Sequence, residues 1–278
     1  MLTYIAIIIA LITAYTELNV FLIKRRSRKP GKIMDGAEPW YWKSGKRGVL
    51  MIHGFSTSPY EFKELGKFLL KKGCTVYCPL LPGHGISPER LSIVHWYDYI
   101  ETLSVALKTL ERDCNEIHII GNSFGGNLAC LIANKSEKVK SLVLLGSPFV
   151  IKHYRIKRVL LSIFHRLKVI QKKKYKKEVQ QLPYFKEAPI YNAIPLRSLF
   201  EVKKILGLSR KELKNVEKPI LIMQAVDDSY VSQKSPEFIL KNIQSVVKEV
   251  VWVENSYHLL VVDRQKKKVF KRIEEFVR

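Results

Sequence analysis

The sequence has little of several features that would point to particular protein classes. Only four of its 278 residues are cysteines, and Cys74, Cys78, Cys114 and Cys130 lack metal-site spacing and have no histidine cluster beside them. We therefore expect reduced thiols in the core or at the surface, in agreement with a cytoplasmic domain. There are no internal repeats, and short lysine runs are the only low-complexity patches.

Acidic residues are also scarce, with 25 Asp and Glu against 48 Lys and Arg, for a net charge of +23. Between Lys152 and Lys177 there are 11 basic residues and no acidic one, and apolar residues recur there at helical spacing. This pattern predicts a basic amphipathic helix that rests on an anionic membrane surface, although a solvated basic face has the same composition. No nucleic-acid-binding module is present, so we expect no nucleic-acid partner.

The N-terminal segment differs from the rest of the chain. Residues 1–23 are mostly apolar, interrupted by Glu17 and Asn19, and a basic cluster follows at Lys24–Lys29. A cleaved signal peptide would carry its positive charge before the apolar run. The segment therefore predicts an uncleaved transmembrane anchor, a single-pass membrane protein with its large domain in the cytoplasm. A helix lying on the membrane surface or docked on the domain is the alternative, because Glu17 and Asn19 are costly in hydrocarbon.

After a basic linker and entry segment at 24–44, residues 45–278 suit one α/β domain. Short β-branched runs alternate with amphipathic stretches, which predicts a mostly parallel sheet covered by helices on both faces. The predicted strands are Arg47–His53, Cys74–Leu80, Glu116–Gly121, Lys140–Gly146, Pro219–Ala225 and Val247–Val253.

Helices are predicted between these strands. The first has the best start signal, because Ser58 and Glu61 have capping-box spacing and Pro59 suits the first turn. The others are predicted at Trp96–Arg112, Asn127–Asn134, Pro236–Asn242 and Arg264–Val277. The alternation stops at about 147–215, and since a structureless loop of that length is uncommon, we predict an inserted helical cap above the carboxyl ends of the strands.

A glycine-flanked serine lies between a predicted strand and a predicted helix, in the sequence Gly-Asn-Ser-Phe-Gly at 121–125. A strand, tight turn and helix in this order lift the Ser123 hydroxyl clear of the sheet and aim the helix N-terminus at developing negative charge. Ser123 is therefore a candidate nucleophile; an ordinary turn with a serine cap is the alternative.

A serine nucleophile needs a base and an orienting carboxylate. Two aspartates, Asp227 and Asp228, follow one predicted strand, and His258 follows the last. Because parallel strands end at the same sheet edge, these turns can converge on Ser123. Either aspartate could be the acid on this reasoning. Two backbone amides should complete an oxyanion hole, and we assign them to Phe55 and Phe124.

Five motifs together resemble the α/β-hydrolase superfamily, in particular its bacterial carboxylesterase and monoacylglycerol-lipase branch. They are His-Gly-Phe at 53–55, Pro-Gly-His-Gly at 82–85, Gly-Asn-Ser-Phe-Gly-Gly at 121–126, Gln-Ala-Val-Asp-Asp at 224–228 and Ser-Tyr-His at 256–258. The chain order Ser, Asp, His is that of this superfamily. The resemblance implies Asp228 as the acid, and ester hydrolysis through an acyl-enzyme without metal or cofactor.

We therefore expect a serine esterase with Ser123, His258 and Asp228 as its catalytic residues. The apolar N-terminus, the basic segment and the aromatic residues Phe55, Phe124 and Phe149 near the predicted mouth favour a monoacyl lipid or medium-chain ester as substrate. An acyltransferase that uses the same three residues, or a non-catalytic lipid-binding protein on this fold, are the alternative functions.

Overall fold

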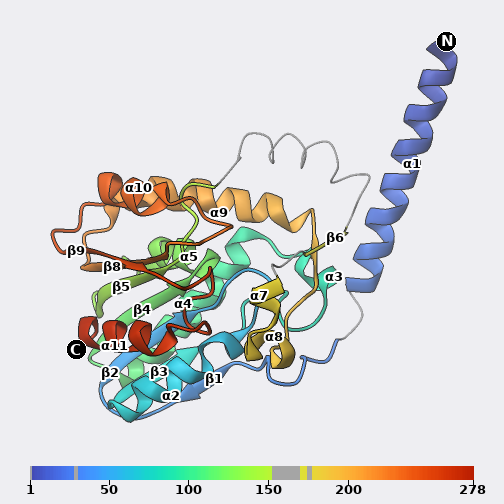
Figure 1. Cartoon of the computed structure of the whole chain (residues 1–278). Helices are drawn as coiled ribbons and strands as arrows, with labels where there is room; N and C mark the ends of the chain where they lie inside the picture. Colours follow the sequence, from blue (N-terminus) through green and yellow to red (C-terminus); the bar gives the residue numbers. More distant parts are fainter. Residues whose placement is uncertain (1, 28–30, 152–169, 174–176) are drawn as a thin grey trace.

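The computed structural model describes residues 2–27, 31–151, 170–173 and 177–278. Within these ranges seven strands form one sheet, in the order β1-β3-β2-β4-β5-β8-β9 (Figure 1). Every neighbouring pair is parallel except β1 and β3. The strands are β1 Trp40–Trp42, β2 Arg47–Ile52, β3 Cys74–Cys78, β4 Glu116–Asn122, β5 Val139–Leu145, β8 Ile220–Ala225 and β9 Lys248–Val253. Strand β1 lies in the segment predicted as a linker.

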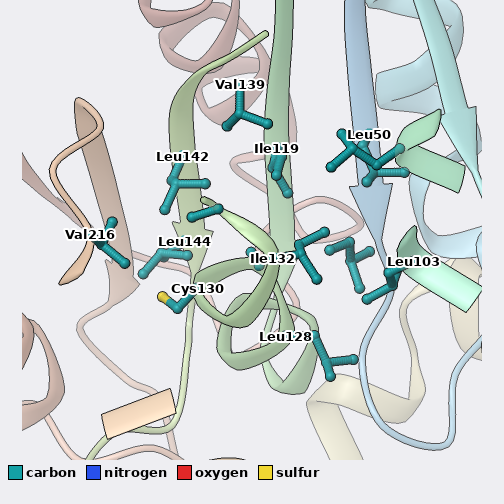
Figure 2. Packing of buried hydrophobic residues seen from close by; sticks show 14 of the residues in the cluster. Leu50, Leu103, Ile119, Leu128, Cys130, Ile132, Val139, Leu142, Leu144 and Val216 are labelled. Carbon is teal, nitrogen blue, oxygen red and sulfur yellow. The ribbon is translucent and has the colours of Figure 1, made fainter. Parts of the chain in front are cut away.

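The central strands are buried on both faces, which explains their nearly continuous apolar sequences. In β2, Leu50 and Ile52 point into one core and Val49 and Met51 into the other, as the two-residue period of a strand requires. Figure 2 shows part of the first core, where Leu50 lies near side chains of the neighbouring strands and helices.

Helices cover both faces of the sheet, as predicted (Figure 1). The first core is closed by α4 (Trp96–Asp113), α5 (Phe124–Ile132) and α10 (Lys234–Asn242), and the second by α2 (Lys63–Lys71) and α11 (Lys266–Phe276). The short helix α3 is Pro88–Leu91. All four cysteines are buried and free.

The predicted capping box before the first helix is wrong. A 3₁₀ turn, η1 (Pro59–Phe62), precedes α2, and Ser58 is its N-cap residue without a side-chain capping bond. The Glu61 side chain instead turns inward to Gly54 and Asn122. The tertiary contacts of Glu61 therefore replace the local pairing that the spacing suggested.

Between β5 and β8 the chain leaves the sheet, where a cap was predicted at about 147–215. Its described elements are β6 Ile170–Lys172, α7 Lys177–Gln180, α8 Pro183–Glu187, β7 Ala193–Pro195, α9 Ser198–Glu212 and η2 Leu213–Asn215. Strands β6 and β7 pair antiparallel. The basic amphipathic helix predicted within 152–177 falls largely outside the described residues, and the predicted domain boundaries stay a prediction.

The predicted transmembrane span is not supported. Helix α1 (Leu2–Ser27) extends away from the sheet and contacts α3 (Figure 1). In the described parts of the chain, no helix is both long enough and apolar enough to cross a bilayer. Glu17 lies within the apolar stretch of α1, and a carboxylate there is expensive in hydrocarbon.

Candidate active site

Ser123 stands on a strained turn between β4 and α5. Its φ is 51° and its ψ is −118°, a conformation that is rare for residues other than glycine. The flanking glycines allow the turn to pack tightly. A Cβ at Gly125 would lie 2.0 Å from the Ile52 carbonyl oxygen, and one at Gly121 would lie 2.4 Å from the Gly125 oxygen. The turn therefore holds the Ser123 hydroxyl above the sheet edge.

His258 joins Ser123 to Asp228. Its Nε2 lies 2.9 Å from the Ser123 Oγ, and its Nδ1 lies 2.7 Å from Asp228 Oδ2. An ionised carboxylate can only accept hydrogen bonds, so Nδ1 carries the proton and Nε2 is left to accept the one on Ser123. The structure thus brings together the three residues that the sequence nominated from three separate turns.

Asp228 is buried and held in a defined orientation. Its Oδ2 accepts a hydrogen bond from Gln224 Nε2 at 2.8 Å, and its Oδ1 accepts from the amides of Tyr230 and Val231 at 2.8 and 2.9 Å. Burial by itself would raise the pKa of Asp228. His258 and the Val231 and Tyr230 amides outweigh it and hold the pKa of Asp228 below its ordinary value, so the carboxylate stays charged at neutral pH.

Asp227, the other candidate acid, is exposed, whereas the carboxylate of Asp228 is the one that reaches His258. The two neighbours differ because the Asp228 carboxylate is buried and accepts a hydrogen bond from the buried Gln224 side chain. The structure therefore separates two residues that sequence spacing left equivalent.

The two predicted oxyanion residues lie beside Ser123. Phe124 begins α5, and Phe55 lies in the loop after β2, with the two rings edge to face at a centroid distance of 5.6 Å. Both residues line the cavity that contains Ser123 and His258. Phe149, predicted at the mouth, is instead fully buried and stacks on Phe238, so that prediction is wrong.

The cavity above Ser123 has a volume of about 380 Å³ and is lined mainly by apolar side chains. The segment between β5 and β8 supplies much of its wall, through Ile151, Val179, Leu182, Phe185, Ile194 and Val202. A mostly apolar pocket with a few convergent polar groups is typical of a small-molecule site. Among the described residues, no group of three or more His, Cys, Asp or Glu side chains is arranged to hold a metal ion.

Comparison with known proteins gives the family. The Hydrolase_4 profile, described as Serine aminopeptidase, S33, matches residues 43–265, which is most of the chain. The chain belongs to this family. Its fold and relatives also place it among the α/β-hydrolases, as a serine hydrolase of the carboxylesterase and monoacylglycerol-lipase type.

The chain is similar over nearly its whole length to two bacterial enzymes. It is 27% identical over 252 residues to the thermostable monoacylglycerol lipase of Bacillus sp. (strain H-257), a match covering 88% of this chain and 95% of that protein. It is 24% identical over 242 residues to the carboxylesterase of Bacillus subtilis (strain 168), covering 86% and 96%.

The structure is similar to a chain from the study "LipS and LipT, two metagenome-derived lipolytic enzymes". The TM-score is 0.81 at 25% identity, covering 88% of this chain and 99% of the other. The monoacylglycerol lipase of Paleococcus ferrophilus has the same fold, with a TM-score of 0.73 at 14% identity and coverages of 86% and 97%.

Two buried carboxylates of this S33-family site were missed by sequence reasoning. Asp263 Oδ2 accepts hydrogen bonds from Ser256 Oγ, at 3.0 Å, and from the amide of Tyr257, and so braces the loop that carries His258. Its only sequence signal is a carboxylate five residues after the histidine. Glu61 was assigned to a helix cap, so its spacing pointed to the wrong partner.

Glu61 contacts the loop that carries Phe55. Its Oε1 accepts a hydrogen bond from the Gly54 amide at 2.7 Å and another from Asn122 Nδ2 at 3.1 Å. Burial raises the pKa of Glu61 to about 7, and the Gly54 and Asn122 donors offset only part of that rise. In the same loop, the Ser56 carbonyl oxygen accepts a hydrogen bond from Lys173 Nζ at 3.3 Å.

Proposed function

We propose that this serine hydrolase cleaves monoacylglycerol-like or medium-chain carboxylic esters through an acyl-enzyme intermediate. The observation that carries the proposal is the hydrogen-bonded series Ser123–His258–Asp228 at the floor of an apolar cavity. The names of two relatives, a monoacylglycerol lipase and a carboxylesterase, support the ester class. The apolar wall supports an acyl chain as the group that fills the cavity.

In the proposed mechanism, Ser123 Oγ attacks the ester carbonyl carbon while His258 Nε2 takes the hydroxyl proton. The Phe55 and Phe124 amides hold the resulting oxyanion, and Asp228 stabilises the imidazolium. The carbonyl re-forms and the alcohol leaves with the proton from His258, which produces the acyl-enzyme. Water then adds by the same route, and the fatty acid is released.

The lipid part of this proposal predicts a chain-length dependence. The purified protein should hydrolyse monoacylglycerols and medium-chain chromogenic esters with a higher kcat/KM than the acetate ester, because a longer chain buries more apolar surface in the cavity. Replacing Val202, which lines the cavity, by phenylalanine should fill part of the cavity. We expect it to lower the ratio of medium-chain to acetate kcat/KM by about tenfold.

The matched control is Val105→Phe on α4, where Val105 is 58% exposed to solvent. This variant should keep the parent ratio. Hydrolysis confined to short water-soluble esters would remove the lipid part of the proposal. Product analysis with an added acceptor alcohol should yield mainly free fatty acid; a dominant transesterified product would indicate an acyltransferase instead.

We also propose that the protein works at the cytoplasmic surface of a membrane, held by α1 without spanning the bilayer. Large apolar side chains of α1, including Tyr4, Leu11 and Leu18, are exposed to solvent. The basic cluster that begins in the last turn of α1 complements anionic lipid headgroups. Apolar burial and charge attraction together should support reversible binding.

Flotation with anionic phosphatidylglycerol vesicles tests this location. The full chain should float with the vesicles, and the double variant Leu11→Glu/Leu18→Glu should reduce the bound fraction by about tenfold, because carboxylates oppose insertion into the headgroup region. The control Val105→Glu/Val246→Glu places the same charges at exposed positions outside α1 and should float like the parent. A parent chain that stays in the soluble fraction would exclude the proposed location.

A further inference from the structure

One carboxylate oxygen joins the two loops that carry the predicted oxyanion amides. Glu61 Oε1 accepts from the amide of Gly54, which precedes Phe55, and from the side chain of Asn122, which precedes Ser123. The two loops are directly apposed at this point, because a Cβ at Gly54 would lie 3.7 Å from Asn122 Nδ2. The position of Glu61 is therefore coupled to the separation between the loops.

Burying the Glu61 carboxylate is energetically unfavourable, which indicates a role beyond packing. Glu61 is 1% exposed, and its Oε2 has no hydrogen-bond partner among the described residues. A buried acceptor left without a partner is unfavourable, and so is a buried charge, which burial partly prevents here by raising the pKa of Glu61 to about 7. An uncharged acceptor would satisfy the Gly54 and Asn122 donors at lower cost.

We propose that Glu61 is a positioning residue for the oxyanion hole, which sets the separation between the Phe55 and Phe124 amides. This inference rests on the proposed function, since it requires those two amides to bind the oxyanion. Glu61 is hydrogen-bonded to each loop close to the amide donor, because Gly54 lies one residue before Phe55 and Asn122 lies two residues before Phe124. A shift of either loop would move one donor relative to the other.

The test compares Glu61→Ala with Glu61→Gln in the full chain, using a medium-chain chromogenic ester. The concentration of competent sites is first counted with a fluorophosphonate, which bonds its phosphorus to Ser123 Oγ and releases fluoride. Per competent site, Glu61→Ala should lower kcat by about 10- to 100-fold and change KM by less than about threefold, because misplaced donors weaken transition-state binding selectively. Glu61→Gln keeps an acceptor oxygen and should retain most of the parent kcat.

A second readout follows oxyanion binding itself. A trifluoromethyl ketone forms a reversible tetrahedral adduct with the active-site serine, and its affinity should fall in Glu61→Ala by about the same factor as kcat. If Glu61 only supported the fold, the variant would contain fewer competent sites, but each remaining site would keep the parent kcat and ketone affinity. That result would overturn the proposal.

Asn122→Ala removes the other end of the bridge and serves if Glu61→Ala does not fold. It should lower kcat per competent site by a smaller factor, and the two substitutions together should cost little more than Glu61→Ala alone, because they break one connection. Fully multiplicative losses would contradict the bridge. A parent protein that neither labels nor turns over would refute the proposed function, whereas an active parent with an unaffected Glu61→Ala would refute only the positioning role.

Discussion

Replacing Ser123 by alanine is expected to lower kcat for a medium-chain ester by a factor on the order of 10⁶, the largest effect we predict. The substitution removes the only oxygen within hydrogen-bond distance of His258 Nε2 among the described residues, so the acyl-enzyme cannot form. Alanine is no larger than serine and is strained to a similar degree at a φ of 51°, so the fold should persist. Steady-state kinetics and fluorophosphonate labelling measure the loss.

A serine-to-alanine change elsewhere provides the control. Ser104 lies on α4, and its hydroxyl donates to the Ile100 carbonyl of the same helix. Ser104→Ala should retain the parent kcat and the parent labelling. Matched circular dichroism spectra would show that Ser123→Ala is folded. If Ser123→Ala kept more than a tenth of the parent turnover, another nucleophile would be required.

The second large effect is expected at Asp228. Asp228→Asn should lower kcat by about 10⁴-fold, because the amide can offer an N–H where His258 Nδ1 needs an acceptor. The imidazole would then favour the tautomer with its proton on Nε2, which cannot accept the proton of Ser123. Buried donors from Gln224, Tyr230 and Val231 would also lose a charged acceptor. Kinetics normalised to labelled sites measure the effect.

The adjacent aspartate is a close control. Asp227 is exposed and one residue away, so Asp227→Asn makes the same chemical change without touching His258. It should leave kcat within about twofold of the parent, as expected for a surface substitution. Equal losses at both positions, or a larger one at Asp227, would show that Asp228 does not orient the histidine.

Much of the sheet was predictable because its strands are buried on both faces. The apolar runs that predicted Arg47–His53 and Glu116–Gly121 correspond to β2 and β4 within one residue at each end. Strand β1 was missed because it is a three-residue edge strand, and so short a segment has no periodicity to detect.

The N-terminal helix shows the limit of composition as a guide. A helix was expected there and one is present, but its transmembrane character was inferred from overall apolarity despite Glu17. The described part of the insertion is also more mixed than a helical cap, because it contains the antiparallel pair β6 and β7 beside its helices. Local sequence did not predict those strands because each has only three residues.

The sequence by itself determined the succession of β2, β3, β4, β5, β8 and β9 along the chain, and the three turns on which Ser123, Asp228 and His258 stand. These features depend on residue patterns within a few positions, such as apolar runs and glycine-flanked turns. Residue spacing left Asp227 and Asp228 equivalent and the family resemblance favoured Asp228, but only the tertiary structure showed which carboxylate reaches His258 and that Glu61 turns inward to Gly54 and Asn122. Such choices depend on which partner lies nearby after the chain has packed, and residues up to 61 positions apart make those contacts.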